Sequence, residues 1–373
     1  MFFVVVLGIW TALNAYVGWR LVGLPWVAAH LGARWTALAI MLLWLSYPTA
    51  RLLSARGQHA VAQPLEFIGA TWIGVLFLIF ATLLVVEVVT LGGWILPRFA
   101  PLLRTGAVLA GLFLGGVALF QGLRAPVVRE HEVVLPGLPR AHDGLTLIIV
   151  SDLHLGTLIG TNWLAARLAQ IDALRPDAVL IAGDLVDSDL DGALALQPVL
   201  RRLQAPLGVF CVLGNHDVYA GTRRVVDFAT GAGVKVLRNQ AVELAPGLRL
   251  AGIDDPATLR GATTADHRLR DALAGTSGAA TILLAHTPDS HTAGEAAAAG
   301  VGLMFSGHTH GGQLWPFGHL VRARHPLFAG RYDVGAMTVL VGRGTGTWGP
   351  RMRLWSPGEI LRVRLRSAAG RAT

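Results

Sequence analysis

The distribution of apolar residues divides the sequence into two parts that meet near residue 124. The first part holds four long apolar stretches, each near the ~20 residues that a helix needs to cross a bilayer. They cover residues 2–19, 35–53, 67–91 and 105–123. We therefore expect a membrane domain over residues 1–123 with about four transmembrane helices.

The second part shows short apolar runs that alternate with stretches of helical periodicity. Runs at 145–150, 178–182 and 208–213 are typical of buried strands, and residues 161–174 place Leu164, Leu168 and Ile171 on one helical face. Further strand-like runs lie at 234–237, 248–253, 281–285, 301–305, 337–342 and 359–365. This alternation predicts an α/β domain over residues 145–373 in which helices cover the faces of a sheet.

The polar, proline-marked residues 124–144 join the two parts. Two interpretations stay open for this segment: a linker, or the first edge strand of the second domain.

Composition supports a membrane protein, because 53% of the residues are hydrophobic and the mean hydropathy is +0.54. The net charge of +8 comes with no long run of basic residues, so we expect no nucleic acid as a partner, whereas the apolar stretches predict a lipid bilayer as one. The single cysteine, Cys211, excludes an intrachain disulfide and is expected to be an inert buried thiol. The oligomeric state is left open.

The charges near the apolar stretches do not show which side of the membrane the second part lies on. Four arginines are expected on each side of the membrane, so their count does not orient the protein. On the side of the second part are Arg51, Arg56, Arg124 and Arg129, and on the other side are Arg20, Arg34, Arg98 and Arg104. Glu87 is the one acid inside an apolar stretch, and we expect it to be interfacial or protonated.

Polar side chains follow five of the short apolar runs in the second part, at the point where each predicted strand ends. They are Asp152 and His154 in SDLHLG, Asp184 and Asp187 in GDLVD, Asn215, His216 and Asp217 in GNHD, His286 in AHTPD, and His308 and His310 in SGHTHGG. Loops beyond the carboxyl ends of strands form the ligand crevice of an open α/β sheet. Neighbouring strands would therefore bring these side chains together.

This set of side chains suits a pair of metal ions. It offers carboxylate, amide and imidazole groups without a thiolate, which favours manganese, iron or zinc. Two ions ~3.5–4 Å apart clamp the attacking and departing oxygens of a displacement at phosphorus. Such a pair needs a shared carboxylate, for which Asp184 is the candidate, and His216 is suited to act as a general acid.

The ordered motifs resemble those of the calcineurin-like metallophosphoesterases over most of residues 145–365. The longer stretches GHTHGGQLWPFG and GRGTGTWGPRMRLWSPGEI are similar to a bacterial branch that often carries membrane segments, with relatives described as transmembrane proteins with a metallophosphoesterase domain. The resemblance implies two packed β-sheets flanked by helices, and so an α/β/β/α sandwich.

The resemblance also implies roles for individual residues. Asp152, His154 and His310 would hold the first metal ion, Asn215, His286 and His308 the second, and Asp184 would bridge them. The two ions would most readily be Mn²⁺. A hydroxide between them would attack phosphorus. His216, positioned by Asp217, would protonate the leaving oxygen.

Other residues near the motifs have less specific interpretations. Asp187 and Asp289 are expected to cap a helix or orient a neighbour. Candidate phosphate contacts are Arg324, Arg331, Arg343 and Arg351. Trp315, Phe317 and Trp348 either line a mouth near the site or the membrane, or pack in the core.

The expected function is that of a membrane-anchored phosphomonoesterase or phosphodiesterase, with a lipid-linked phosphate such as a nucleotide-diphospho-glycolipid as one substrate class, in the manner of a UDP-diacylglucosamine hydrolase. One alternative is a nuclease or cyclic-nucleotide phosphodiesterase, which the lack of a basic run disfavours. Another is a sensor or scaffold without catalysis, which predicts missing ligands, whereas the sequence keeps them all.

Overall fold

The structure, a computed structural model, describes residues 2–259, 267–276 and 278–368. The chain divides into two compact units. One consists of Met1–Arg124 with Gly349–Trp355, and the other of Ala125–Trp348 with Ser356–Thr373.

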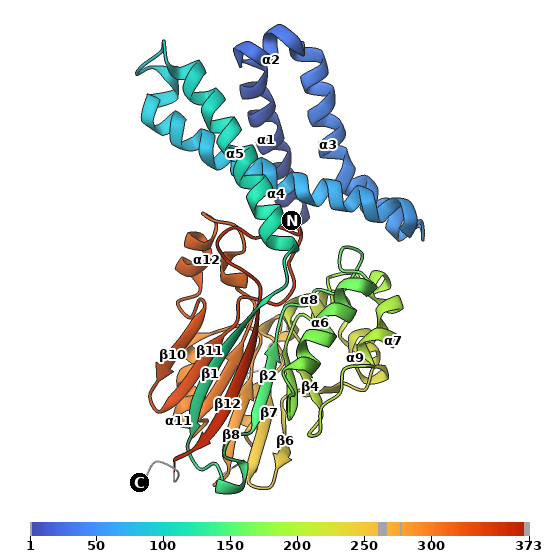
Figure 1. Ribbon diagram of the computed structural model, residues 1–373, viewed down its shortest axis with the longest axis vertical. Coiled ribbons are helices and arrows are strands. Elements are labelled where there is room, and N and C mark those ends of the chain that lie inside the picture. The colour runs from blue at the N-terminus through green and yellow to red at the C-terminus, as the bar shows by residue number, and fades with distance from the viewer. Residues whose placement is uncertain (1, 260–266, 277, 369–373) are drawn as a thin grey trace. The chain divides into compact units, whose positions relative to one another are not determined.

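The first unit is helical (Figure 1). Its elements are α1 (Phe2–Val22), α2 (Pro25–His30), α3 (Gly32–Ala55), α4 (His59–Thr90), η1 (Leu91–Gly93) and α5 (Ala100–Leu123). Three helical stretches in the described residues are long and apolar enough to cross a membrane: Gly32–Ala55, His59–Gly93 and Ala100–Leu123. Helices suit lipid because they satisfy their own backbone hydrogen bonds.

Helices α4 and α5 approach closely because α5 carries glycines at the contact. A Cβ atom at Gly111 would lie 2.6 Å from Cα of Ile79, and one at Gly115 would lie 3.0 Å from a methyl of Val75. Four-residue spacing of small residues lets helix backbones pack in membranes. Thr82 Oγ1 also donates a hydrogen bond across this contact to the carbonyl of Ala107 at 2.8 Å.

Glu87 joins three helices through its carboxylate. The guanidinium of Arg20 on α1 lies 2.8 Å from it, and that of Arg104 on α5 lies 2.9 Å away. Arg20 also stacks over the ring of Trp19 at 3.9 Å. The acid expected to be interfacial or protonated is therefore held between two arginines from different helices.

The second unit is built on two six-stranded sheets. The first has the order β1-β12-β2-β3-β4-β5, with β1 (Val127–Leu135), β2 (Thr146–Val150), β3 (Ala178–Ala182), β4 (Val209–Val212), β5 (Lys235–Val236) and β12 (Glu359–Ser367). The second has the order β10-β11-β9-β8-β7-β6, with β6 (Gln240–Ala245), β7 (Leu248–Gly252), β8 (Ala280–Leu284), β9 (Leu303–Ser306), β10 (Gly330–Val334) and β11 (Met337–Val341).

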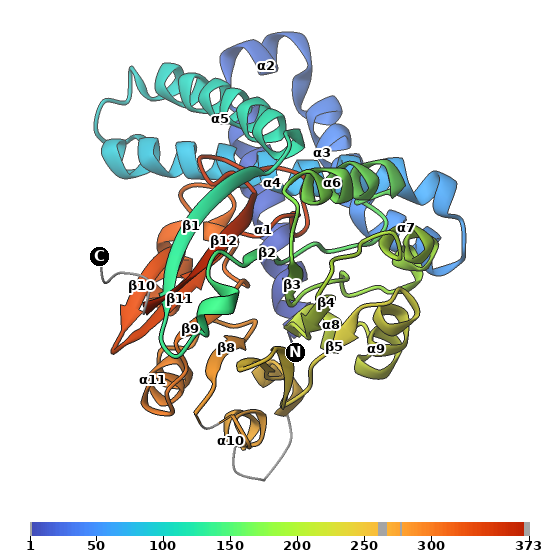
Figure 2. The ribbon, with the colours of Figure 1, turned by 60° about the horizontal axis from the view of Figure 1, so that its bottom comes forward.

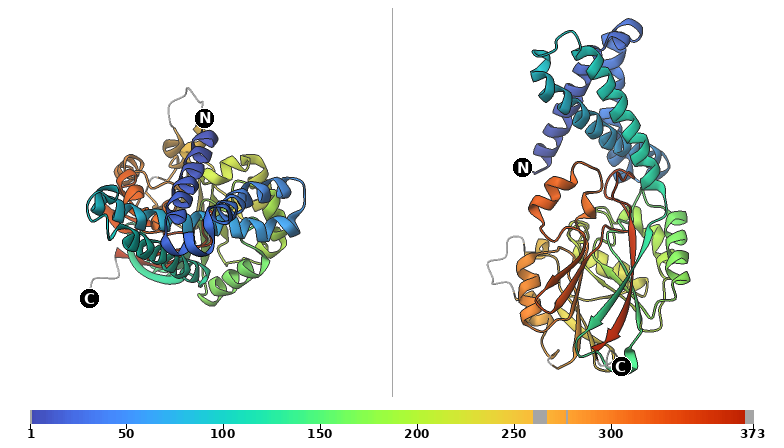
Figure 3. Two further views of the ribbon diagram at one scale, coloured as in Figure 1. Left: turned by 90° about the horizontal axis from the view of Figure 1, so that it is seen from above. Right: turned by 60° about the vertical axis from the view of Figure 1, so that its left-hand side comes forward.

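The edge of the first sheet comes from the segment that follows the apolar helices of the first unit. Strand β1 pairs in parallel with β12, from Val127 opposite Glu359 to Leu135 opposite Ser367, and Figure 3 shows the two long strands side by side. Within residues 124–144, a strand thus forms at 127–135. Strand β12 then pairs antiparallel with β2.

Alternation along the strands produces four layers. Ile148 and Val150 of β2 pack with the helices α6 (Thr161–Ala173), α7 (Gln197–Leu200) and α9 (Thr222–Gly231). Leu147 and Ile149 point the other way, into a core shared with the second sheet. The far face of that sheet packs against α10 (Arg268–Ala272) and α11 (Ser290–Ala298), and Figure 2 shows these helix groups on opposite sides. The predicted α/β/β/α sandwich is confirmed.

The shorter elements lie in connections between strands. They are η2 (Arg140–His142), η3 (Asp191–Leu196), α8 (Asn215–Tyr219), η4 (Pro256–Leu259), η5 (His310–Gly312) and α12 (Gly318–Arg324). Three of them, α8, η5 and α12, carry or follow predicted site residues.

The close approach of α4 and α5 leads to a first prediction. Replacing Gly111 with valine should destabilise the helical unit by roughly 1–3 kcal/mol, as overpacking does, because the new side chain meets the backbone of Ile79. The matched control is Gly116→Val on the same helix, where a Cβ meets nothing within 4 Å. Thermal unfolding of the purified full chain in detergent measures the difference. Equal unfolding temperatures for the two variants would contradict this packing.

Candidate metal centre

The predicted site residues all lie just beyond the carboxyl ends of strands from both sheets. Strands β2, β3 and β4 are parallel neighbours in one sheet, and β8 and β9 are parallel neighbours in the other. The loops that follow these five strands therefore meet at one end of the sandwich. Three overlapping groups of ligand atoms, each within 4.8 Å, result there: Asp152, His154 and His310; His154, Asp184 and His216; and Asp152, Asp184 and His286.

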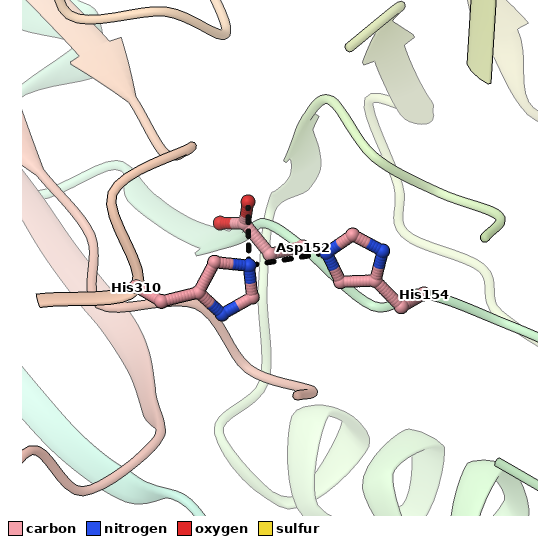
Figure 4. Close-up of side chains that lie close together, drawn as sticks. All are labelled: Asp152, His154 and His310. Carbon is pink, nitrogen blue, oxygen red and sulfur yellow. Dashed lines mark hydrogen bonds and ion pairs between the residues drawn. The ribbon is translucent and has the colours of Figure 1, made fainter. Parts of the chain in front are cut away.

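The first cluster consists of Asp152, His154 and His310 (Figure 4). The Nε2 atoms of the two histidines lie 3.1 Å apart, and Nε2 of His310 lies 3.5 Å from Oδ1 of Asp152. All three side chains are buried. Two imidazole nitrogens and a carboxylate oxygen thus converge in a site shielded from water.

Asp184 connects this cluster to a second one. Its Oδ2 atom lies 3.1 Å from Nε2 of His286 and 3.7 Å from Nε2 of His154. Its other oxygen accepts a hydrogen bond from the backbone N–H of His216 at 2.9 Å, which fixes the orientation of the carboxylate. One oxygen of Asp184 is therefore close to histidines of both clusters.

The remaining ligand candidates complete the second cluster. Nδ1 of His308 lies 2.9 Å from the amide oxygen of Asn215, and the rings of His308 and His286 are 5.2 Å apart. The backbone N–H of His308 donates to Oδ1 of Asp152 at 3.0 Å, which ties the two clusters together. The structure thus brings together all seven residues for which the sequence predicts metal ligation.

The donor set fits divalent cations. Burial lowers the pKa of His154, and burial together with nearby His286 lowers the pKa of His308 to about 3, so both rings are neutral, as metal ligation requires. Burial opposes a charge on His286, but the carboxylate of Asp184 outweighs it and raises the pKa of His286 well above its usual value. Positive charge is therefore favoured beside Asp184, where a cation would supply it.

The backbone at the ligands is held in an unusual conformation. Five of the seven ligand candidates have positive φ angles: Asp152 (53°), His154 (45°), Asp184 (51°), His308 (71°) and His310 (51°). A non-glycine residue in this left-handed region costs about 1–3 kcal/mol and such residues gather at functional sites. The strain therefore marks the same site independently of the residue types.

Two glycines allow the carboxylates to come this close to their neighbours. A Cβ atom at Gly214 would lie 2.1 Å from Oδ1 of Asp184, and one at Gly307 would lie 2.5 Å from Oδ2 of Asp152. Each glycine precedes a ligand-bearing segment and packs against the carboxylate of a different segment. The glycines in GNHD and SGHTHGG therefore make room for the metal ligands themselves.

His216 is held by a different carboxylate from the one that the sequence suggested. Its Nδ1 atom lies 3.1 Å from Oδ1 of Asp187 and 2.9 Å from the hydroxyl of Ser188. Burial lowers the pKa of His216, but the hydrogen bond with Asp187 and the charges of Asp184 and Asp187 together outweigh burial, and the net shift is upward. Partial burial raises the pKa of Asp187, but the hydrogen bond with His216 and the nearby His154 together lower it to about 2. The protonated form of His216 is therefore favoured.

We predicted that Asp217 positions His216. Its carboxylate instead binds the backbone of the neighbouring loop. Its fully buried carboxylate accepts hydrogen bonds from the backbone N–H groups of Gly214 at 2.8 Å, Val186 at 3.0 Å and Leu185 at 3.3 Å. Asp217 directly follows His216 on the short helix α8, so its side chain projects away from the imidazole of His216. Burial raises the pKa of Asp217 to about 7.

Other predicted residues have identifiable positions. Asp289 caps α11 by accepting from the N–H of Thr292, as expected of a capping residue. Arg331 and Arg343 are near acids, Asp333 at 3.7 Å and Glu359 at 3.2 Å.

Cys211 is buried, and burial raises the pKa of its thiol, as an inert core residue requires. Arg351 lies in the segment of the first unit, Gly349–Trp355. His325, whose ring lies 5.1 Å from that of His308, was missed because no motif marks it.

Several known proteins are similar to this chain in sequence. Residues 145–312 match the family model of the calcineurin-like phosphoesterases. An uncharacterised metallophosphoesterase of Campylobacter jejuni is 31% identical over 261 residues, which cover 69% of this chain and 68% of that protein. One from Bacillus subtilis is 31% identical over 281 residues, which cover 71% of this chain and 94% of that protein.

A relative from Bos taurus is named as a transmembrane protein. This transmembrane protein with a metallophosphoesterase domain is 33% identical over 275 residues, which cover 70% of this chain and 62% of that protein. The resemblance seen in the motifs is thereby confirmed, and these relatives support a phosphoric ester hydrolase. The apolar helical stretches and the name of this relative support an association with the membrane. The chain belongs to the calcineurin-like phosphoesterases.

Proposed function

We propose that this chain is a membrane-anchored phosphoesterase with two divalent metal ions, for which Mn²⁺ is the first candidate. Asp152, His154 and His310 would hold one ion, Asn215, His286 and His308 the other, and Asp184 both. The observation that carries the proposal is the position of Asp184, whose Oδ2 atom lies within 3.7 Å of histidines from both clusters.

The chain's own residues divide the remaining work. Two bound ions would supply Lewis acidity at phosphorus and lower the pKa of water. His216 would donate the proton to the departing oxygen, because its imidazole lies at the cluster with its ring 4.8 Å from that of His154. Asp187 would keep His216 protonated and oriented, and Asp217 would hold the loop that carries Asp187.

A lipid-linked phosphomonoester or phosphodiester is the substrate class that we favour. The support is the presence of helices long and apolar enough to cross a membrane in the same chain as the metal centre. A non-catalytic scaffold is disfavoured because the described site keeps every predicted ligand together with His216.

Asp184→Ala tests the metal centre directly. Purified full chain should hydrolyse bis-p-nitrophenyl phosphate when Mn²⁺ is added, and the variant should lose at least about 10³-fold in turnover because both ions lose a shared ligand. Asp333→Ala is the matched control, since this carboxylate is 70% exposed on β10. A variant at Asp184 that kept wild-type turnover would exclude this centre as the catalyst.

Leaving-group dependence tests the general acid. His216→Ala should reduce hydrolysis of an alkyl phosphate ester by about 10²–10⁴-fold, as loss of a general acid does, and should affect a p-nitrophenyl ester far less because nitrophenolate departs without a proton. Asp187→Asn should show the same selectivity in weaker form, because it removes the carboxylate bound to His216.

Asp217→Asn separates the two aspartates. It should lower the unfolding temperature and impair both esters equally, since Asp217 holds backbone N–H groups and not His216. Selective loss of alkyl ester hydrolysis in Asp217→Asn, with none in Asp187→Asn, would restore the pairing that the sequence suggested.

A further inference from the structure

Four large apolar side chains are exposed near the metal centre. Trp315, Phe317, Leu320 and Trp348, which we name the apolar rim, are 44%, 42%, 68% and 53% exposed. The ring of Trp348 lies 5.7 Å from that of His216. Core packing, one of the two interpretations open for the aromatic members, does not describe side chains with this exposure.

The rim is fixed to the loop that carries His308 and His310. The side chain of Gln313 donates to the carbonyl of Trp348 at 2.8 Å and accepts from its N–H at 3.0 Å. The N–H of Phe317 donates to the carbonyl of Leu314 at 2.8 Å. Gly312 packs so closely that a Cβ atom there would lie 2.2 Å from Cα of Gly318. A surface that bound the rim would therefore be held at a defined position relative to the metal ligands.

Basic residues adjoin the rim on the same short helix. Helix α12, labelled in Figure 1, carries Leu320 and ends with the exposed Arg322 and Arg324. The next residue, His325, contacts the ring of His308. Exposed tryptophan, phenylalanine and leucine beside arginine form the composition that settles at the interface of an anionic bilayer.

We propose that the apolar rim and the arginines of α12 enter the headgroup region of an anionic lipid bilayer. The metal centre would then act on phosphate esters that lie at the bilayer surface. This substrate assignment rests on the proposed function, whereas the membrane contact does not. The chain's own membrane helices keep this unit near a bilayer, and tethering raises the effective concentration of the lipid surface. Lipid is therefore the occupant that we infer for the rim, in preference to a protein partner.

A fluorescent label at Leu320 tests the contact in the full chain. Cys211 is fully buried, so a cysteine introduced at Leu320 can be labelled selectively with an environment-sensitive dye. The labelled protein is placed in nanodiscs of phosphatidylglycerol and phosphatidylcholine, with and without lipids that carry a nitroxide in the headgroup region. Leu194→Cys is the matched control, because Leu194 is 49% exposed on η3, outside the rim.

We expect nitroxide lipids to quench the label at position 320 at least about twofold more than the label at position 194, since only the former lies in the interface. Arg324→Gln, or replacement of phosphatidylglycerol by phosphatidylcholine, should reduce this quenching. Equal quenching at the two positions would overturn the proposal. So would a blue-shifted label at position 320 without quenching by nitroxide lipid, which would indicate a protein contact.

The same measurement in an Asp184→Ala background separates the two proposals. Quenching should persist there, because the lipid contact needs no catalysis. Selective quenching at position 320 in a wild-type chain that hydrolysed no phosphate ester would refute the proposed function alone. Activity on bis-p-nitrophenyl phosphate without selective quenching at position 320 would refute the membrane contact alone.

Discussion

The carboxylate of Asp184 lies between two groups of histidines, and the rest of the site depends on this position. His154 comes from the loop after β2, and His286 from the loop after β8 in the other sheet. Both sheets must therefore pack at one spacing for a single carboxylate to reach the two imidazoles. The core between the sheets, which includes Leu147, Ile149 and Phe305, maintains that spacing. Packing far from the ligands thus determines the geometry of the ligands.

Bringing seven polar side chains into one largely buried site costs desolvation free energy. Hydrogen bonds to the backbone offset part of this cost. Backbone N–H groups of His216 and His308 bind the carboxylates of Asp184 and Asp152, and Asp217 binds three backbone groups of adjoining loops. These bonds hold the ligands in strained left-handed conformations that an isolated loop would leave. Metal binding to the folded state would offset the remaining cost by stabilising that state over the unfolded chain.

Much of this organisation could be predicted from the sequence. Strands such as 178–182 were identified by their short apolar runs, and the site by the polar residues that follow them. The partner of His216 could not be predicted, because Asp187 and Asp217 are both near it and only the turn of α8 decides which carboxylate faces the imidazole.

Three further features could not be predicted from the sequence. Glu87 meets Arg20 and Arg104 only when three helices pack together. The left-handed backbone of the ligands leaves no mark in residue type. Exposure of the aromatic residues after His310 likewise required the folded loop, since the sequence pattern fitted a core as well as a surface.

The central claim is that one carboxylate is shared by two metal ions, and electron paramagnetic resonance of the Mn²⁺-loaded full chain tests it most directly. Two ions joined by Asp184 should lie ~3.5–4 Å apart and give the spectrum of an exchange-coupled pair, with two equivalents of manganese bound per chain. Asp184→Ala should abolish the coupling. A six-line spectrum of isolated Mn²⁺ with one equivalent bound to the wild-type chain would contradict the account.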